Sequence, residues 1–89
     1  MPKMVITHGV ADVGKWLGFK AERAEAIAAL GGTDLVEHVA HDGSNMIALS
    51  FSVADVDAIM AKLGSPPPEL AAVMEKHGVL PPLVAYAEG

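Results

Sequence analysis

The chain has 89 residues, of which 52% are hydrophobic and 19% charged, and its formal charge at pH 7 is -5. An acidic chain of this kind lacks the phosphate-neutralising surface of a nucleic-acid-binding protein. It contains no cysteine, which excludes a disulfide framework, a thiolate nucleophile and a thiolate metal site.

Eighty-nine residues suffice for one small domain, which we expect to span residues 1–89. The mean hydropathy of +0.38 is more apolar than a lone domain of this size can hide, so we expect self-association. No apolar run approaches the roughly 20 residues that span a bilayer, and the apolar stretch at the N-terminus is too short for a signal peptide. We therefore expect a soluble, cytoplasmic protein that binds neither membranes nor nucleic acid.

Residues 4–10 are predicted to form a strand whose side chains alternate between two faces. One face carries Met4, Ile6, His8 and Val10, and the other carries Val5, Thr7 and Gly9. His8 is therefore expected to lie among apolar neighbours.

A helix is predicted from Val13 to Leu30, with Asp12 as its N-cap and Gly31 and Gly32 at its end. The helical period gathers an apolar stripe that should face a sheet. Its members are Val13, Trp16, Leu17, Ala24, Ile27 and Ala28, with Phe19 and Leu30 on its flank.

Residues 35–41 and 46–53 are predicted to form two strands joined by a turn at residues 42–45, whose Asp-Gly-Ser-Asn composition suits a hairpin. The second strand alternates, with Ile47, Leu49, Phe51 and Val53 on the core face. The small side chains on its other face would suit an open concavity or a closely packed partner.

Ser52 and Asp55 have the spacing of a capping box, which predicts a helix over residues 56–63. Gly64 and the prolines at 66–68 should break this helix, and a short helix resumes over residues 69–77 and ends at Gly78. A last strand is predicted over residues 80–88.

The predicted order of elements is βαββαβ, with the second helix in two pieces. Two overlapping right-handed βαβ units give an α+β domain with a four-stranded antiparallel sheet, strand order 4-1-3-2, and helices on one face. The other face is left open, so we expect two chains to pack sheet against sheet as a homodimer.

Several residues near the two ends of the chain resemble those of a known superfamily. They are His8, Val10, Asp12 and Trp16, followed by Ser65-Pro66, Leu70, Met74, Gly78-Val79 and Pro82. With them the sequence resembles small bacterial proteins of the dimeric α+β barrel superfamily, close to the antibiotic biosynthesis monooxygenase-like group. The resemblance implies a ferredoxin-like subunit whose sheets form a barrel in an obligate homodimer. The superfamily includes cofactor-independent monooxygenases, polyketide cyclases and lactone isomerases.

His8 is the candidate catalytic residue. A histidine with apolar neighbours stays neutral and can act as a general base toward a phenol or a carbon next to a carbonyl. The other interpretation of His8 is a core histidine with one hydrogen bond to backbone.

Five further residues are candidates for contacts with a ligand. Trp16, Phe19 and Phe51 could supply apolar walls, although space-filling in the core also explains them. His38 could be a second polar group of the pocket, and Tyr86 could offer its phenol to a ligand or anchor the dimer rim. His41 is interpreted as a solvated turn residue, and His77 as a helix-end residue that satisfies terminal carbonyls.

A metal site within the sheet would need His8, His38 and Glu37 to converge, but Glu37 and His38 alternate to opposite faces. We therefore expect neither a metal nor another cofactor.

The first hypothesis for the function is an enzyme of the cofactor-independent monooxygenase or cyclase/isomerase type that acts on an apolar or aromatic small molecule. The alternative is a non-catalytic dimer that binds a small molecule or serves as an assembly unit.

Overall fold

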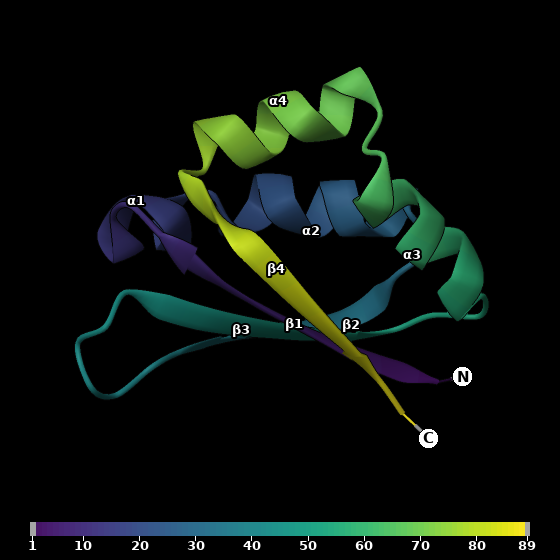
Figure 1. Cartoon of the computed structure of the whole chain (residues 1–89), viewed down its shortest axis with the longest axis horizontal. Coiled ribbons are helices and arrows are strands. Elements are labelled where there is room, and N and C mark those ends of the chain that lie inside the picture. The colour runs from purple at the N-terminus through teal and green to yellow at the C-terminus, as the bar shows by residue number, and fades with distance from the viewer. Residues whose placement is uncertain (1, 89) are drawn as a thin grey trace.

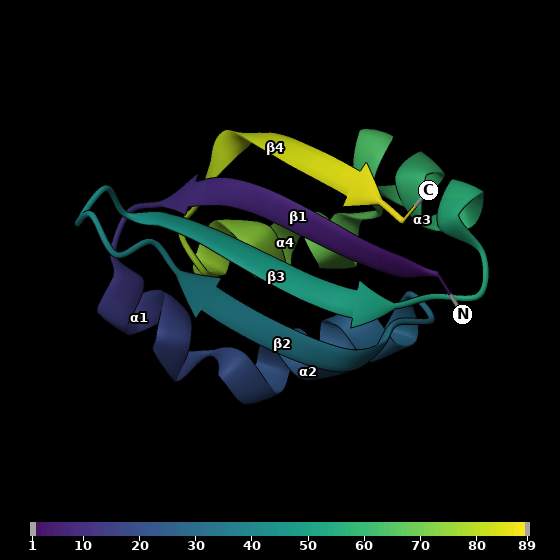
Figure 2. The same ribbon diagram turned by 90° about the horizontal axis from the view of Figure 1, so that it is seen from below.

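A four-stranded antiparallel sheet with helices on one face forms the protein, and the computed structural model describes residues 2–88 of it. The elements along the chain are β1 (Lys3–Val10), α1 (Val13–Gly18), α2 (Lys20–Ala29), β2 (Thr33–Val39), β3 (Met46–Ser52), α3 (Val56–Gly64), α4 (Pro68–Lys76) and β4 (Val79–Ala87). The strand order is β2-β3-β1-β4, which is the predicted order read from the opposite edge. All the helices lie above the sheet in Figure 1, and Figure 2 shows the other face of the sheet uncovered. The predicted α+β, ferredoxin-like fold is confirmed.

The core lies between the sheet and the helices because the two central strands turn their larger apolar residues to that side. β1 and β3 pair with Met4 opposite Phe51, Ile6 opposite Leu49 and His8 opposite Ile47, and these side chains are buried. The predicted alternation in both strands is confirmed. One full set of apolar side chains is thereby removed from water, which is the main stabilising term in a domain of this size.

The single helix predicted from Val13 to Leu30 is wrong, because the structure has two helices that meet at Phe19. Phe19 leaves helical geometry, with φ -97° and ψ 17°, and its ring stacks on His77 at a centroid distance of 4.6 Å. The change of direction brings α2 beneath α4 (Figure 1). Three members of the predicted apolar stripe are exposed, namely Leu17, Ala24 and Ala28. Arg23 and Ile27 are the buried residues of α2.

The starts of α1 and α3 are capped by hydrogen bonds to aspartate side chains. Asp12 caps α1 as predicted, accepting a bond from the Lys15 backbone N–H at 3.0 Å. Asp55, not Ser52, is the N-cap of α3, accepting from the Ala58 backbone N–H at 3.0 Å. The predicted capping box is therefore wrong, because Ser52 is still part of β3.

The last two elements of the chain, α4 and β4, contribute no buried residue to the core. α4 has no buried residue, and its inward side chains Leu70, Val73 and Met74 are only half-buried. β4 contains Pro81 and Pro82, which its position at the edge of the sheet permits. Among residues 2–88, no helix is long and apolar enough to cross a membrane.

Candidate functional site

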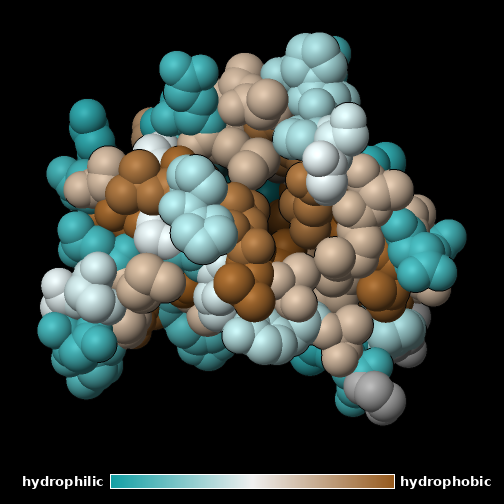
Figure 3. Space-filling view, in the orientation of Figure 1, coloured by the Kyte–Doolittle hydropathy of each residue, from teal (hydrophilic) through white to brown (hydrophobic). Residues whose placement is uncertain are grey.

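A small, mostly apolar cavity lies between the sheet and the helices α2 and α4. Its volume is about 60 Å³, and its apolar walls include Ile6, Leu30, Leu49, Leu70, Met74 and Leu83. His8, Arg23 and His77 are the polar residues of its lining. Figure 3 shows a hollow between α4 and β4 that is rimmed by hydrophobic side chains.

The cavity adjoins a wider groove between α2 and α4, with a volume of about 440 Å³. The two spaces share Ala26, Leu30, Leu70 and Val73 in their walls. A volume of about 60 Å³ has room for only a few water molecules, since one needs roughly 10–15 Å³ on this measure. The apolar body of a larger ligand therefore has to extend along the groove or displace half-buried side chains of α4.

His8 faces the cavity from β1 and is 3% exposed. Its Nδ1 lies 2.8 Å from the Gly9 carbonyl oxygen, so Nδ1 carries the proton and donates it to that oxygen. The tautomer leaves a lone pair on Nε2. Burial lowers the pKa of His8 below its ordinary value of 6.5, the bond to Gly9 opposes this, and the Arg23 charge lowers it further. His8 is therefore a neutral base at pH 7.

Arg23 is the charged residue of the cavity and is 6% exposed. Its Nε donates to the Glu37 carboxylate in a buried ion pair that joins α2 to β2. Its guanidinium carbon lies 3.7 Å from the centroid of the Trp16 ring, a cation–π contact. Nη1 is 3.3 Å from His77 Nδ1, and Nη2 is buried without a hydrogen-bond partner among the described residues.

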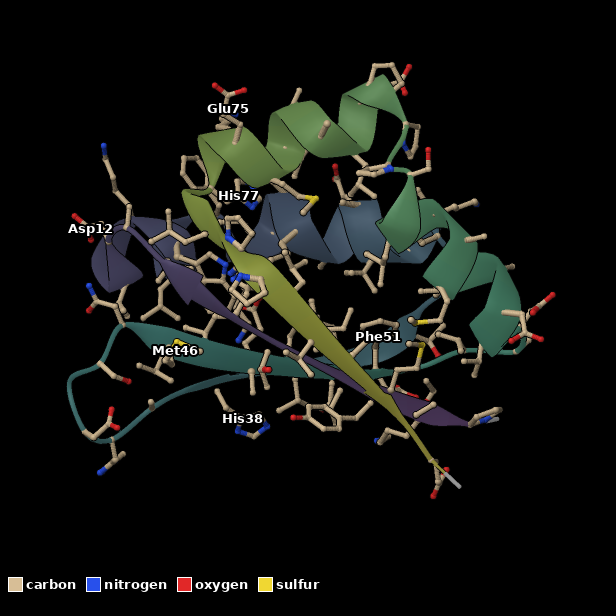
Figure 4. The ribbon with its side chains drawn as sticks, in the orientation of Figure 1. Asp12, His38, Met46, Phe51, Glu75 and His77 are labelled. Carbon is tan, nitrogen blue, oxygen red and sulfur yellow. The ribbon has the colours of Figure 1, made fainter. Side chains whose placement is uncertain are left out.

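His77 closes the upper end of the site, just after α4, and is 3% exposed. Arginine can only donate, so the contact with Arg23 makes His77 Nδ1 the acceptor and places the proton on Nε2. Nε2 lies 3.6 Å from Glu22 Oε1, beyond hydrogen-bonding distance. Burial is the main cause that lowers the pKa of His77, and the Arg23 charge adds to it. In Figure 4 the His77 ring lies below α4 and faces a cluster of nitrogen atoms.

The structure separates the predicted site residues into two groups. His8 lines the cavity, while Trp16 and Phe51 are fully buried in the core near it. Phe19 stacks on His77 and is not part of the cavity lining. Aliphatic side chains, not the predicted aromatic ones, form the apolar walls.

His38 and Tyr86 lie on the uncovered face of the sheet. His38 pairs with Ala48, and Tyr86 pairs with Val5, both of which turn away from the helices. Figure 4 shows His38 below the sheet, on the opposite side from His77. The structure therefore does not bring His38 or Tyr86 to His8, and the set His8, His38 and Glu37 does not converge.

The sequence did not indicate that two further residues, Arg23 and His77, line the cavity. Arg23 follows Trp16 by seven residues, which is two turns of the single helix predicted from the sequence, and this spacing was the available signal. It was left out of the apolar stripe because arginine is rarely buried without a partner. The sequence predicts that His77 satisfies carbonyls at the end of a helix, whereas in the structure its ring stacks on Phe19 and its Nδ1 contacts Arg23.

No family model matches the chain, and no curated protein sequence matches it at a significant level. Solved structures do resemble it. A protein from Bordetella bronchiseptica, provisionally assigned as an antibiotic biosynthesis monooxygenase, superposes with a TM-score of 0.67 at 15% identity, over 99% of this chain and 94% of that one. An antibiotic biosynthesis monooxygenase superposes with a TM-score of 0.64 at 9% identity, over 100% and 97% of the two chains.

A dimeric ferredoxin-like protein from an uncultured marine organism also superposes, with a TM-score of 0.61 at 9% identity, over 100% of this chain and 93% of that one. These likenesses show that the chain shares the ferredoxin-like fold of antibiotic biosynthesis monooxygenase-like proteins. They cover the whole chain, so one subunit of such a protein corresponds to one copy of this chain.

Proposed function

We propose that the protein binds an apolar or aromatic small molecule in the cavity between sheet and helices and removes a proton from it with His8. The observation that carries this proposal is the state of His8: neutral, fixed through Nδ1 by the Gly9 carbonyl, and lining a mostly apolar cavity. A general base needs a free lone pair and has to be unprotonated at the working pH, and this arrangement supplies both. Reaction types of the cofactor-independent monooxygenase and cyclase/isomerase kind begin with that step.

Proton transfer to His8 Nε2 leaves an enolate or phenolate and an imidazolium. Return of the proton to another carbon completes an isomerisation. In a cyclisation the carbanion attacks a carbonyl carbon, and the alkoxide that forms takes the proton back from His8. With O2 as the oxidant, the carbanion forms a C–O bond and takes up a proton as a hydroperoxide, which loses water to give a ketone. An apolar cavity favours all three because it holds few competing proton donors.

The uncovered face of the sheet is the proposed homodimer interface. Exposed apolar side chains on this face include Val36, Val84 and Tyr86, and His38 lies among them. One similar structure is described as dimeric, and it has the same fold as this chain over 100% of this chain and 93% of its own. We place the dimer in the cytoplasm because a chain without cysteine makes no use of an oxidising compartment.

One observation favours a second candidate function, a dimer that binds a small molecule without transforming it. The cavity of about 60 Å³ is far smaller than the roughly 300 Å³ at the lower end of ligand pockets. In this candidate the adjoining groove between α2 and α4 holds the ligand, and His8 serves the packing of the core.

Deuterium exchange tests the proposed function without knowledge of the natural substrate. The apolar aromatic ketone β-tetralone is incubated with the protein in D2O, and loss of its α-proton signals is followed by NMR. The wild type is expected to accelerate the exchange over buffer, and His8→Gln to lower that acceleration by about a hundredfold or more. The matched control is His41→Gln, which changes an exposed turn histidine.

An acceleration that persists in His8→Gln would contradict the role of His8. Saturable binding of β-tetralone with no acceleration in the wild type would favour the non-catalytic candidate. Circular dichroism of each variant shows whether the fold is retained.

A further inference from the structure

We propose that Arg23 is a second catalytic residue, which binds the oxygen atom of the substrate through its Nη2 and stabilises the negative charge that develops there. The inference rests on the proposed function, and it narrows the substrate to a neutral, apolar ketone or phenol. The oxygen lies at Arg23, and the apolar body extends into the groove beneath α4.

The hydrogen bonds of Arg23 leave one part of its guanidinium free. Nε donates to Glu37 and Nη1 contacts His77, whereas Nη2 is buried without a partner among residues 2–88. A guanidinium has only donors, so Nη2 needs an acceptor, and a buried donor without one is costly. Arg23 also lines the cavity. An acceptor atom of a ligand in that cavity would satisfy Nη2.

Trp16 holds Arg23 and His8 in fixed positions relative to each other. The ring is fully buried, with the guanidinium over its face at 3.7 Å and the His8 ring at its edge, 6.3 Å between centroids and 79° between planes. The base and the oxygen-binding group therefore belong to one rigid cluster. A ligand that places its oxygen at Arg23 carries its acidic proton, on the adjacent carbon of a ketone or on the oxygen of a phenol, in the same cavity that His8 lines.

The charges of the cluster favour a neutral ligand over an anion. Glu37 neutralises Arg23, and its Oε1 is itself buried without a partner. Glu22 and Lys76 pair with each other at the surface, and the groove that continues the cavity carries more acidic than basic side chains, namely Glu22, Glu25, Glu69 and Lys62. A carboxylate ligand would add an uncompensated negative charge beside Glu37. A ketone or phenol that gives its proton to His8 leaves the net charge of the site unchanged, because the anion forms at Arg23 and the cation at His8.

The shape of the site gives the direction of the ligand. The cavity at Arg23 has room for a small polar end, and Ala26, Leu30, Leu70 and Val73 continue its wall into the wider groove. The inward side chains of α4 are only half-buried, so this helix presents apolar surface to the groove. The apolar part of the ligand covers that surface.

Two probes of similar shape test the inference, para-nitrophenol and its methyl ether para-nitroanisole. Binding of each is followed by quenching of Trp16, the single tryptophan, and the visible absorbance of para-nitrophenolate reports its ionisation when bound. In the wild type, bound para-nitrophenol is expected to show phenolate absorbance from about one pH unit or more below the free compound, because its proton passes to His8 and the net charge of the site is unchanged. Arg23→Gln should abolish this shift and weaken the binding of para-nitrophenol about tenfold or more. The affinity for para-nitroanisole should change less than about twofold.

Because Arg23→Gln leaves Glu37 unpaired, the pair variant Arg23→Gln/Glu37→Gln provides a second comparison with no net change in buried charge. The ionisation of para-nitrophenol on the wild type needs no variant at all. If bound para-nitrophenol ionises as it does in solution, or if Arg23→Gln weakens both probes equally, the role of Arg23 is overturned. If β-tetralone exchange still depends on His8 in that case, the proposed function stands without a role for Arg23. If neither probe quenches Trp16 saturably, the ligand site itself is overturned, and the role of Arg23 with it.

Discussion

His8 and His77 make the protein sensitive to acid. Both pKa values are lowered from 6.5, chiefly by burial, so between 6.5 and the folded-state values the unfolded chain binds more protons than the folded one. The contribution of the two histidines to the free energy of unfolding is therefore fully present above about pH 6.5. It is lost as the pH falls through that window. We predict a lower urea midpoint at about pH 5.5 than at about pH 7.5.

The double variant His8→Gln/His77→Gln should lose much less stability over the same pH range, and His41→Gln should behave as the wild type. An equal loss in the double variant would assign the acid sensitivity to other groups.

The rate of β-tetralone exchange should also fall only below pH 6.5, since the neutral form of His8 is the proposed base.

The Arg23–Glu37 pair is predicted to add little net stability to the fold. Removal of one partner alone is nevertheless predicted to lower the free energy of unfolding strongly. Its side chains are 7% and 2% exposed, so Arg23→Met leaves a buried carboxylate without its partner and should cost about 3–5 kcal/mol in the free energy of unfolding. Arg23→Met/Glu37→Leu should recover most of that loss. Denaturant unfolding measures both changes, and Lys76→Gln, which breaks the exposed pair with Glu22, is the control expected to change little. A double variant no more stable than Arg23→Met would contradict this prediction.

The difference between His8 and Arg23 shows what a sequence reveals about single residues. The burial of His8 follows from alternation along its own strand, which is a local property. The burial of Arg23 depends on Glu37, a residue of another element, and on Trp16 beneath it. Such partners are set by strand pairing and helix packing, so the sequence alone predicted the buried position of His8 but not the charge beside it.

At the scale of elements, Gly32 determines how closely the end of α2 approaches β3. A Cβ at Gly32 would lie 2.5 Å from Ile27 Cγ2 and 2.9 Å from Phe51 Cδ2, both in the core. Gly32→Ala should therefore cost about 1–3 kcal/mol in the free energy of unfolding. The control is Gly18→Ala, where a Cβ meets nothing within 4 Å, and a gain of up to about 1 kcal/mol is expected. Equal effects of the two substitutions on the urea midpoint would refute the close contact.

The elements themselves were largely predictable, because alternation, caps and turn residues are local signals. The strand order, the turn at residues 42–45 and the end of α4 before Gly78 all agree with the structure. The break at Phe19 was not predictable, since the ring of His77 that stacks on Phe19 comes from the far end of the chain. The adjustment of α2 that buries Arg23 depends on that same contact.

For the whole molecule, the uncovered sheet face predicts a homodimer. Val84 and Tyr86 are 43% and 56% exposed in one chain, and a charge at either position would be buried in the proposed interface. Tyr86→Glu or Val84→Glu should therefore shift the protein toward monomer in sedimentation equilibrium. Leu17→Glu is the matched control, because Leu17 is 44% exposed on α1, away from this face. A wild type that stays monomeric at high concentration would contradict the dimer.

The most direct measurement of the ligand site is a fluorescence titration of the wild type with para-nitroanisole. Trp16 is the single tryptophan and contacts both Arg23 and His8, so its emission reports on this site. We expect saturable quenching with one site per chain, and at least about tenfold weaker binding in Ala26→Leu, which fills the junction of cavity and groove. Quenching that never saturates, or that is the same in Ala26→Leu, would contradict a ligand site between the sheet and the helices.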